Sequence, residues 1–259
     1  CRSALLVDLD IDGDQDLVGV SYARLILSRN DGTGRFSVAG IMEIGIGAMG
    51  VSAADYDRDG DLDLYVCHYS RGDLDLEAGA TVIGSGGRFV YHDANNAGRN
   101  YLYRNDIRSA SWDFRDVTAE VGLDVNNRRF SLAAGWEDYD NDGDQDVVIN
   151  QLNESPILLH NLSNRPRLKV VLKGRSHNTR AVGARLVLRT GSKTQSHTVQ
   201  AGGRYLSSDG HSQTFALSQD AAPTASMSIH WPDGSQNQIH RLKINQCLTI
   251  EQPEEPLYP

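Results

Sequence analysis

Short runs in which apolar and polar residues alternate recur along this chain, separated by turns rich in glycine and aspartate. Val51–Ala54 and Leu64–Val66 flank one such turn, and Leu168–Leu172 shows the same alternation far along the chain. A period of two residues is typical of β-strands that bury one face. The pattern therefore predicts an all-β protein built from many short strands.

Three of the turns share one nine-residue pattern, in which five aspartates and one glycine hold fixed places. We call them loop 1 (8–16, DLDIDGDQD), loop 2 (55–63, DYDRDGDLD) and loop 3 (138–146, DYDNDGDQD). Small and apolar residues precede each loop, and a β-branched or aromatic run follows it. Repeats of a whole segment indicate a repeat architecture.

A second repeated segment follows each loop and ends at an asparagine: Asn30, Asn105 or Asn161. After the first two, a further strand-like run begins at Phe36 and at Phe114, but the third has no such run. One unit therefore reads strand, aspartate loop, strand, turn, strand, turn, strand, which is a four-stranded propeller blade. The third blade is expected to lack its outer strand.

The aspartate spacing indicates calcium binding. Ca²⁺ takes six to eight oxygen ligands, and alternating aspartates direct their carboxylates to one side of the loop. We expect the sixth residue, glycine, to allow a turn with positive φ, the seventh to offer its backbone carbonyl, and the ninth to close the shell. The predicted ligands of about three Ca²⁺ ions are Asp8, Asp10, Asp12, Asp14, Asp16, Asp55, Asp57, Asp59, Asp61, Asp63, Asp138, Asp140, Asp142, Asp144 and Asp146.

An EF-hand is the nearest alternative, because its loop begins with the same residues. It needs a glutamate at loop position 12, where this chain has Gly19, Val66 and Ile149, and it needs flanking helices. Magnesium is disfavoured because it prefers to keep several water ligands.

Charge divides the chain into two parts. Residues 1–164 carry 13 basic and 28 acidic residues, whereas residues 165–251 carry 12 basic and 4 acidic residues, within a net charge of −9. This reversal predicts a domain boundary near residue 164. The basic part lacks a dense lysine or arginine run, which argues against nucleic-acid binding, and no stretch of about 18 apolar residues is available to span a membrane.

We expect three blades over 1–163, at about 1–47, 48–130 and 131–163, a second domain over 164–252, and a tail over 253–259. Loops 1 and 2 start 47 residues apart but loops 2 and 3 start 83 apart, which predicts a long insertion at about 70–99. The second domain is predicted to be a small β-sandwich, with a hairpin turn at Asp233-Gly234 and Trp231 in its core. Cys67 and Cys247 are either buried thiols or one disulfide.

The loops, together with 30–36 (NDGTGRF) and 116–123 (DVTAEVGL), resemble FG-GAP/VCBS repeats, the blades of integrin-type β-propellers. Residues 164–250 resemble the ASPIC/UnbV domain through 178–185 (NTRAVGAR), 202–206 (GGRYL) and 231–234 (WPDG). The combination is similar to bacterial secreted repeat proteins and the extracellular cartilage acidic proteins. Three blades cannot close a ring, so the resemblance implies either further blades before Cys1, which we favour, or pairing with another chain.

These features favour a non-catalytic, calcium-stabilised scaffold for adhesion to a protein or glycan ligand. It would be secreted, periplasmic or on the cell surface. Arg71-Gly72-Asp73 in the insertion is the tripeptide that integrins recognise, a weak indication of a partner. The alternative is a secreted propeller enzyme whose site lies in missing blades or in the insertion, where His92 and Asp93 are found. Gly45–Gly50 spells a dinucleotide-binding motif, but no helix is expected after it.

Overall fold

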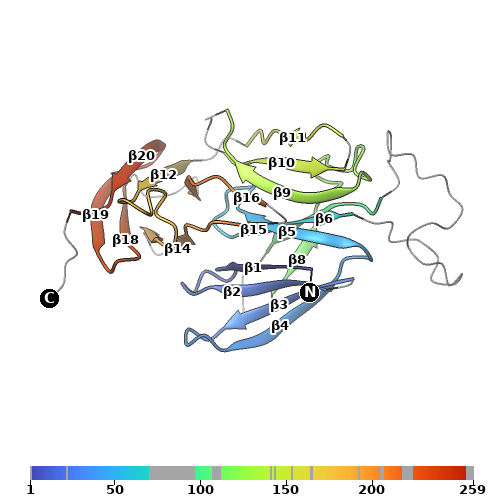
Figure 1. Ribbon diagram of the computed structural model, residues 1–259, viewed down its shortest axis with the longest axis horizontal. Coiled ribbons are helices and arrows are strands. Elements are labelled where there is room, and N and C mark those ends of the chain that lie inside the picture. Colours follow the sequence, from blue (N-terminus) through green and yellow to red (C-terminus); the bar gives the residue numbers. More distant parts are fainter. Residues whose placement is uncertain are drawn as a thin grey trace, which may run out of the picture.

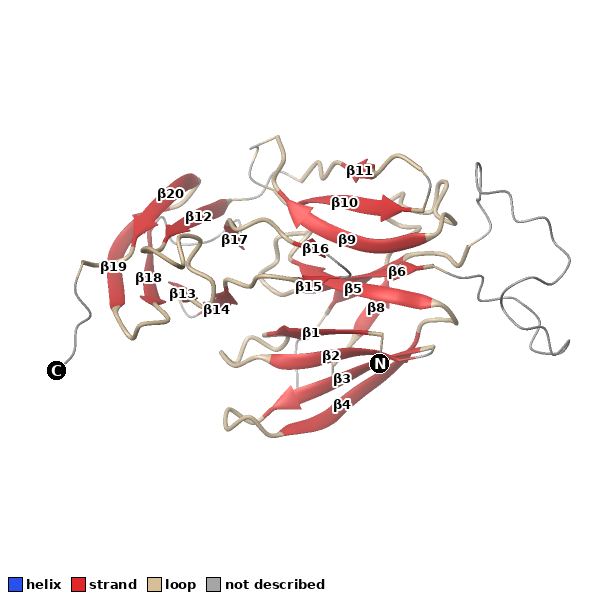
Figure 2. Ribbon diagram, viewed as in Figure 1, coloured by secondary structure: helices blue, strands red, loops and turns tan. Residues whose placement is uncertain are grey.

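The computed structural model describes residues 2–21, 23–69, 97–106, 112–140, 142, 144–152, 154–163, 166–191, 193–204, 207–217 and 224–254. Regular structure in these residues consists of β-strands alone, as Figure 2 shows. The prediction of an all-β fold, with propeller-like blades followed by a second β-domain, is confirmed.

The first two blades are antiparallel four-stranded sheets whose strands lie in chain order. Their strands are β1 (Ser3–Val7), β2 (Asp16–Ser21), β3 (Arg24–Asn30) and β4 (Phe36–Glu43), then β5 (Ala48–Ala54), β6 (Asp63–His68), β7 (Tyr101–Asn105) and β8 (Phe114–Asp116). Loop 1 joins β1 to β2 and loop 2 joins β5 to β6. Because each loop connects the first two strands of its blade, the loops lie at the same end of neighbouring blades. β5 follows the glycine-rich segment 45–50 directly, so the dinucleotide motif has no helix.

The third blade has three strands among the described residues: β9 (Ser131–Glu137), β10 (Asp146–Gln151) and β11 (Ile157–Leu159). Loop 3 joins β9 to β10. Apolar side chains fill the space between successive blades, with Leu25 and Val66 in one layer and Tyr65 and Trp136 in the next. This packing sets the distance between neighbouring loops.

The second domain consists of two sheets around one core that includes Leu168, Leu186, Phe215 and Trp231. Its strands are β12 (Arg167–Lys173), β13 (Arg185–Thr190), β14 (Lys193–Thr198), β15 (Gly203–Arg204), β16 (Ser207–Ser208), β17 (Gln213–Ala216), β18 (Thr224–His230), β19 (Gln236–Lys243) and β20 (Gln246–Glu251). One sheet has the order β17-β12-β20 and the other β14-β13-β18-β19. The hairpin at Asp233-Gly234 and the buried position of Trp231 are confirmed.

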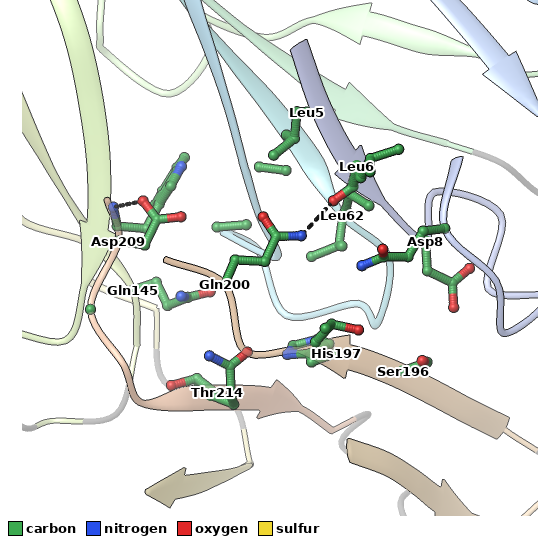
Figure 3. A pocket seen from close by; sticks show the side chains of 18 of the residues that line it. Leu5, Leu6, Asp8, Leu62, Gln145, Ser196, His197, Gln200, Asp209 and Thr214 are labelled. Atoms are coloured by element: carbon green, nitrogen blue, oxygen red, sulfur yellow. Dashed lines mark hydrogen bonds between the residues drawn. The ribbon is translucent and has the colours of Figure 1, made fainter. Parts of the chain in front are cut away.

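The second domain packs against the loop end of the blades. The short β15–β16 hairpin lies against β1, β5 and β9, close to where Figure 1 places β5. The Gln200 side-chain amide donates to the Leu6 carbonyl (2.9 Å), and Asp209 accepts the Trp136 amide (3.1 Å), as Figure 3 shows. A polar cavity of about 110 Å³, lined in part by Gln145 and His197, lies between the two parts. The acidic and basic parts of the chain therefore face each other.

Candidate metal sites

All three aspartate loops fold into the same arrangement of carboxylates. In each, carboxylate oxygens from the first, third and ninth positions lie within 4.8 Å of one another. The three groups are Asp8, Asp10 and Asp16; Asp55, Asp57 and Asp63; and Asp138, Asp140 and Asp146. The residues at the fifth and seventh positions do not join these groups. Three loops far apart in the sequence thus each build one convergent set of oxygens.

The backbone of loops 1 and 2 turns through two residues with positive φ, and the corresponding residues of loop 3 lie outside the described residues. In loops 1 and 2 these are the fourth position (Ile11, 61°; Arg58, 59°) and the sixth (Gly13, 100°; Gly60, 106°). The glycine is needed for a second reason, since a Cβ at Gly13 would stand 3.3 Å from the Arg185 guanidinium. Glycine at the sixth position therefore permits the turn, as predicted, and also leaves room for a side chain of the second domain.

The ninth aspartate of each loop is a structural brace as well as a candidate ligand. Asp16 accepts hydrogen bonds from the backbone amide of Leu9, at the second loop position, and from the backbone amide of Asn30, at the end of β3. The same two bonds are made by Asp63 (from Tyr56 and Asn105) and by Asp146 (from Tyr139 and Asn161). These bonds close the loop and tie it to the end of the third strand of the blade. The ninth carboxylate is therefore already oriented without an ion.

The first aspartate of each loop is buried, with 7%, 7% and 4% exposure at Asp8, Asp55 and Asp138. Both carboxylate oxygens of Asp8 lack a hydrogen-bond partner of normal geometry, although the Gly13 amide is near. Burial, together with the charges of Asp12, Asp16 and Asp10, raises the pKa of Asp8 to about 7. A buried carboxylate without donors is a costly group unless a cation binds it.

Crowding of like charges extends through loop 2. Burial, followed by the neighbouring aspartates, raises the pKa of Asp61 to about 9 and holds the pKa values of Asp55 and Asp63 well above their usual range. In loop 1, burial raises the pKa of Asp16 to about 6. The aspartates of loop 2 are fully charged at neutral pH only when positive charge is brought to them, whereas Asp16 loses its proton more readily.

The fifth and seventh aspartates have a different geometry from that of the converging three. Asp12, Asp59 and Asp142 each accept the backbone amide two residues later, in Asx turns that shape the bend. The seventh side chain in loop 3, Asp144, is fully buried and lies 3.0 Å from the Arg58 guanidinium of loop 2. The structure thus places these six side chains outside the sets formed by the first, third and ninth aspartates, although Asp142 converges with Asp140 and His160 in a further exposed group.

The residues present fit a calcium ion. Every converging group is a carboxylate oxygen, which is the donor that hard cations prefer, and the loop backbone supplies carbonyls nearby. Orphaned buried oxygens on Asp8, Asp10 and Asp138 mark where positive charge is missing. A bound Ca²⁺ would be held by the first, third and ninth carboxylates and would neutralise their mutual repulsion.

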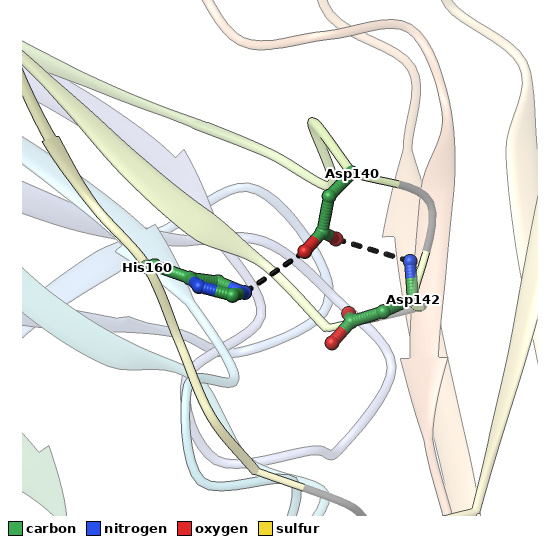
Figure 4. A group of neighbouring side chains, drawn as sticks. All are labelled: Asp140, Asp142 and His160. Atoms are coloured by element: carbon green, nitrogen blue, oxygen red, sulfur yellow. Dashed lines mark hydrogen bonds and ion pairs between the residues drawn. The ribbon is translucent and has the colours of Figure 1, made fainter.

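Several basic side chains beside the loops were not predicted from the sequence. Arg29 lies 2.7 Å from Asp10, and Lys169 lies 2.9 Å from Asp138. His160 lies 2.8 Å from Asp140, which also accepts the Asp142 amide, as Figure 4 shows. A further set of residues that contact the loops could have been found from the sequence. The asparagine that ends each repeated segment donates hydrogen bonds to loop carbonyls, and its recurrence was visible in the pattern.

The remaining sequence predictions concern the insertion and the cysteines. Arg71-Gly72-Asp73, His92, Asp93 and most of the predicted insertion lie outside the described residues. Cys67 is buried, Cys247 is exposed, and no disulfide joins them, so the alternative of a disulfide between them is wrong.

Two family models match the chain. An FG-GAP-like repeat matches residues 8–66, and an ASPIC and UnbV domain matches residues 174–257, which confirms both predicted resemblances. Loop 3 lies outside the first match, yet its carboxylates converge as those of loops 1 and 2 do. A comparison with curated proteins found no match.

FG-GAP repeats generally bind Ca²⁺ and are typical of extracellular proteins. In the part of the chain that the structure describes, no helix has the length and apolar character that crossing a membrane requires. The chain therefore carries an FG-GAP-like repeat in its propeller-like blades, followed by an ASPIC/UnbV domain.

Proposed function

We propose that this protein is a non-catalytic, calcium-binding scaffold that works outside the cytoplasm, with one Ca²⁺ stabilising each of the three loops. The observation that carries the proposal is the threefold recurrence of converging first, third and ninth aspartates. Two of these three positions are buried in every loop, and buried carboxylates that face one another destabilise the fold unless a cation offsets them.

The surroundings support a structural role for the metal. Each loop is the connection between the first two strands of a blade, so an ion there fixes the blade where it meets its neighbour and the second domain. Extracellular modules bind calcium at 10⁻⁴–10⁻³ M, a range in which calcium outside cells keeps loops of this kind filled. The blades would then present their surfaces to a protein or glycan ligand.

Calcium titration and thermal unfolding test the proposal. Calorimetry of the metal-free chain is expected to give about three Ca²⁺ per molecule. Each site contributes about 2.7 kcal/mol to the free energy of unfolding when free calcium exceeds its Kd a hundredfold. The melting temperature in calcium should therefore exceed that in chelator by many degrees.

Magnesium at the same concentration serves as the control and should give a much smaller shift, because it keeps its water ligands. An identical melting temperature in calcium and in chelator, with no heat of binding, would refute the proposal.

A further inference from the structure

Loop 3 has a cation at its first aspartate, which loops 1 and 2 do not have among the described residues. Lys169 contacts this first aspartate at 2.9 Å, and Arg58 contacts the seventh at 3.0 Å. The imidazole of His160 lies 2.8 Å from the third. Arg58 comes from loop 2 and Lys169 from β12 of the second domain, so both cations reach loop 3 from another loop or another domain.

The Lys169 contact falls on a candidate metal ligand and is shielded from water. The side chain of Lys169 is 11% exposed and that of Asp138 is 1% exposed. The ammonium occupies Oδ2 of Asp138, while Oδ1 is buried and has no hydrogen-bond partner. An ion bound at Oδ1 would therefore stand next to a buried ammonium, and the two positive charges would repel each other strongly.

The first aspartates of loops 1 and 2 have no such cation among the described residues, although Arg29, whose side chain is 35% exposed, lies 2.7 Å from the third aspartate of loop 1, Asp10. Asp55 accepts the backbone amides of Asp59 and Gly60. Lys193 of the second domain does reach loop 2, but its ammonium lies 3.4 Å from the backbone carbonyl of Asp59 rather than from a carboxylate. The three loops share a sequence pattern, yet only loop 3 has its first aspartate paired.

We propose that Lys169 is an internal counter-ion that competes with Ca²⁺ for Asp138, so that loop 3 is the weakest calcium site of the three and its filling loosens the contact between β12 and the third blade. The inference rests on the proposed function, since it assumes that the loops bind calcium. It gives the ASPIC/UnbV domain a definite task, which is to set the calcium affinity of one loop. Lys169 acts here as a positioning and affinity-setting residue.

Calorimetric calcium titrations of the full chain test the competition. Lys169→Met keeps the length of the side chain and removes its charge, and it should raise the affinity of the weakest site about tenfold, equivalent to about 1.4 kcal/mol. Lys193→Met is the matched control, because it also removes an interdomain ammonium but not one on a carboxylate. It should change every site by less than about threefold.

Asp138→Asn assigns the weak site. This variant should abolish the weakest binding step, and adding Lys169→Met to it should then have no further effect on calcium affinity. Circular dichroism and melting at saturating calcium check that each variant folds.

The unaltered protein provides an independent measurement. Acetylation of lysines by an amine-reactive ester, followed by mass spectrometry, should show Lys169 becoming several-fold more reactive when calcium rises through the range that fills the weakest site. Lys193 should not change over that range.

Unchanged calcium affinity in Lys169→Met, or equal protection of Lys169 with and without calcium, overturns the inference while leaving the calcium scaffold intact. If the unaltered chain binds no calcium at all, the proposed function fails first, so the two failures are distinguishable.

Discussion

At the scale of single residues, aspartates of one motif have separate tasks. Asp16 is braced by two backbone amides, whereas neither carboxylate oxygen of Asp8 has a partner, although the two residues belong to the same convergent set. A braced carboxylate stabilises the loop with or without metal. An unbraced buried one stabilises it only when a cation is present.

Substitution within loop 1 separates these tasks. Asp16→Asn leaves one buried amide without an acceptor and should cost about 1–3 kcal/mol of unfolding free energy even in chelator. Asp8→Asn removes an unpartnered buried charge, so in chelator at pH 8 its stability should equal or exceed that of the unaltered chain. In calcium it should lose one site's contribution.

Chemical denaturation in chelator and in calcium gives both quantities for each variant. Equal losses for the two variants in chelator would contradict the division of roles.

The raised pKa values predict opposite pH trends for the metal-free and calcium-bound protein. Burial raises the pKa values of Asp8 and Asp144 to about 7 and of Asp16 to about 6, against about 4 in the unfolded chain. The folded metal-free state therefore holds protons that the unfolded state has released, and its stability should fall as pH rises from about 4 through 7. Calcium binding needs the deprotonated form, so the calcium-dependent gain in stability should grow over the same interval.

Denaturation at pH 5, 6.5 and 8, in calcium-stripped buffer and in excess calcium, measures both slopes. A metal-free protein that gains stability between pH 5 and pH 8 would be incompatible with the buried aspartates.

At the scale of elements, each blade fastens the loop of the blade before it. The fully buried Asn105 side chain, at the end of β7, donates to the Leu9 carbonyl of loop 1 (3.1 Å) and the Leu62 carbonyl of loop 2 (3.2 Å). Asn161 repeats this with Tyr56 of loop 2 (2.8 Å) and Gln145 of loop 3 (3.3 Å). One amide group thus connects two loops at each blade boundary.

Asn105→Ala should therefore destabilise the protein by about 1–3 kcal/mol, since buried carbonyls of two loops lose their donor. The matched variant is Asn30→Ala, because the Asn30 side chain donates to Gln15 of its own loop and accepts the amides of Gly32 and Gly34 in an exposed turn, all within one blade. Its cost should be about 1 kcal/mol or less. Equal free energies of unfolding for the two variants would exclude the cross-blade bonds as a source of stability.

Strands, loops and the missing fourth strand of the third blade could be predicted because their signals are local. The alternation of Leu64–Val66 and the spacing of Asp55–Asp63 each lie within one element, and the lack of an aromatic run after Asn161 matches the three strands described. The convergence of the first, third and ninth aspartates follows from the same spacing.

The cations around the loops could not be predicted, since tertiary packing decides them. Arg58 and Asp144 are far apart in the chain, and Lys169 belongs to another domain. The sequence around Arg58 is that of an ordinary loop arginine in contact with solvent. In the structure, however, Arg58 is 2% exposed and has a φ of 59°.

At the scale of the whole molecule, the acidic blades and the basic second domain, which are separate along the chain, contact each other in the fold. The basic second domain places Arg185 beside loop 1, Lys193 beside loop 2 and Lys169 beside loop 3. These three residues bring positive charge from the second domain to each acidic loop. The end of the blades that carries the loops is covered by the chain's own second domain, so a ligand of the proposed scaffold has the other surfaces to bind.

The asparagine that fastens the preceding loop also imposes an order on biosynthesis. Asn105 lies 96 residues after Leu9, and Asn161 lies 105 residues after Tyr56. A ribosome must therefore add roughly a hundred residues beyond loop 1 or loop 2 before the asparagine of the next blade can bond that loop, which takes about 5–20 s at ordinary translation speeds. During that interval the nascent aspartates remain hydrated and open, and a chain that emerges into a calcium-rich compartment can load its ions while its turns are still accessible.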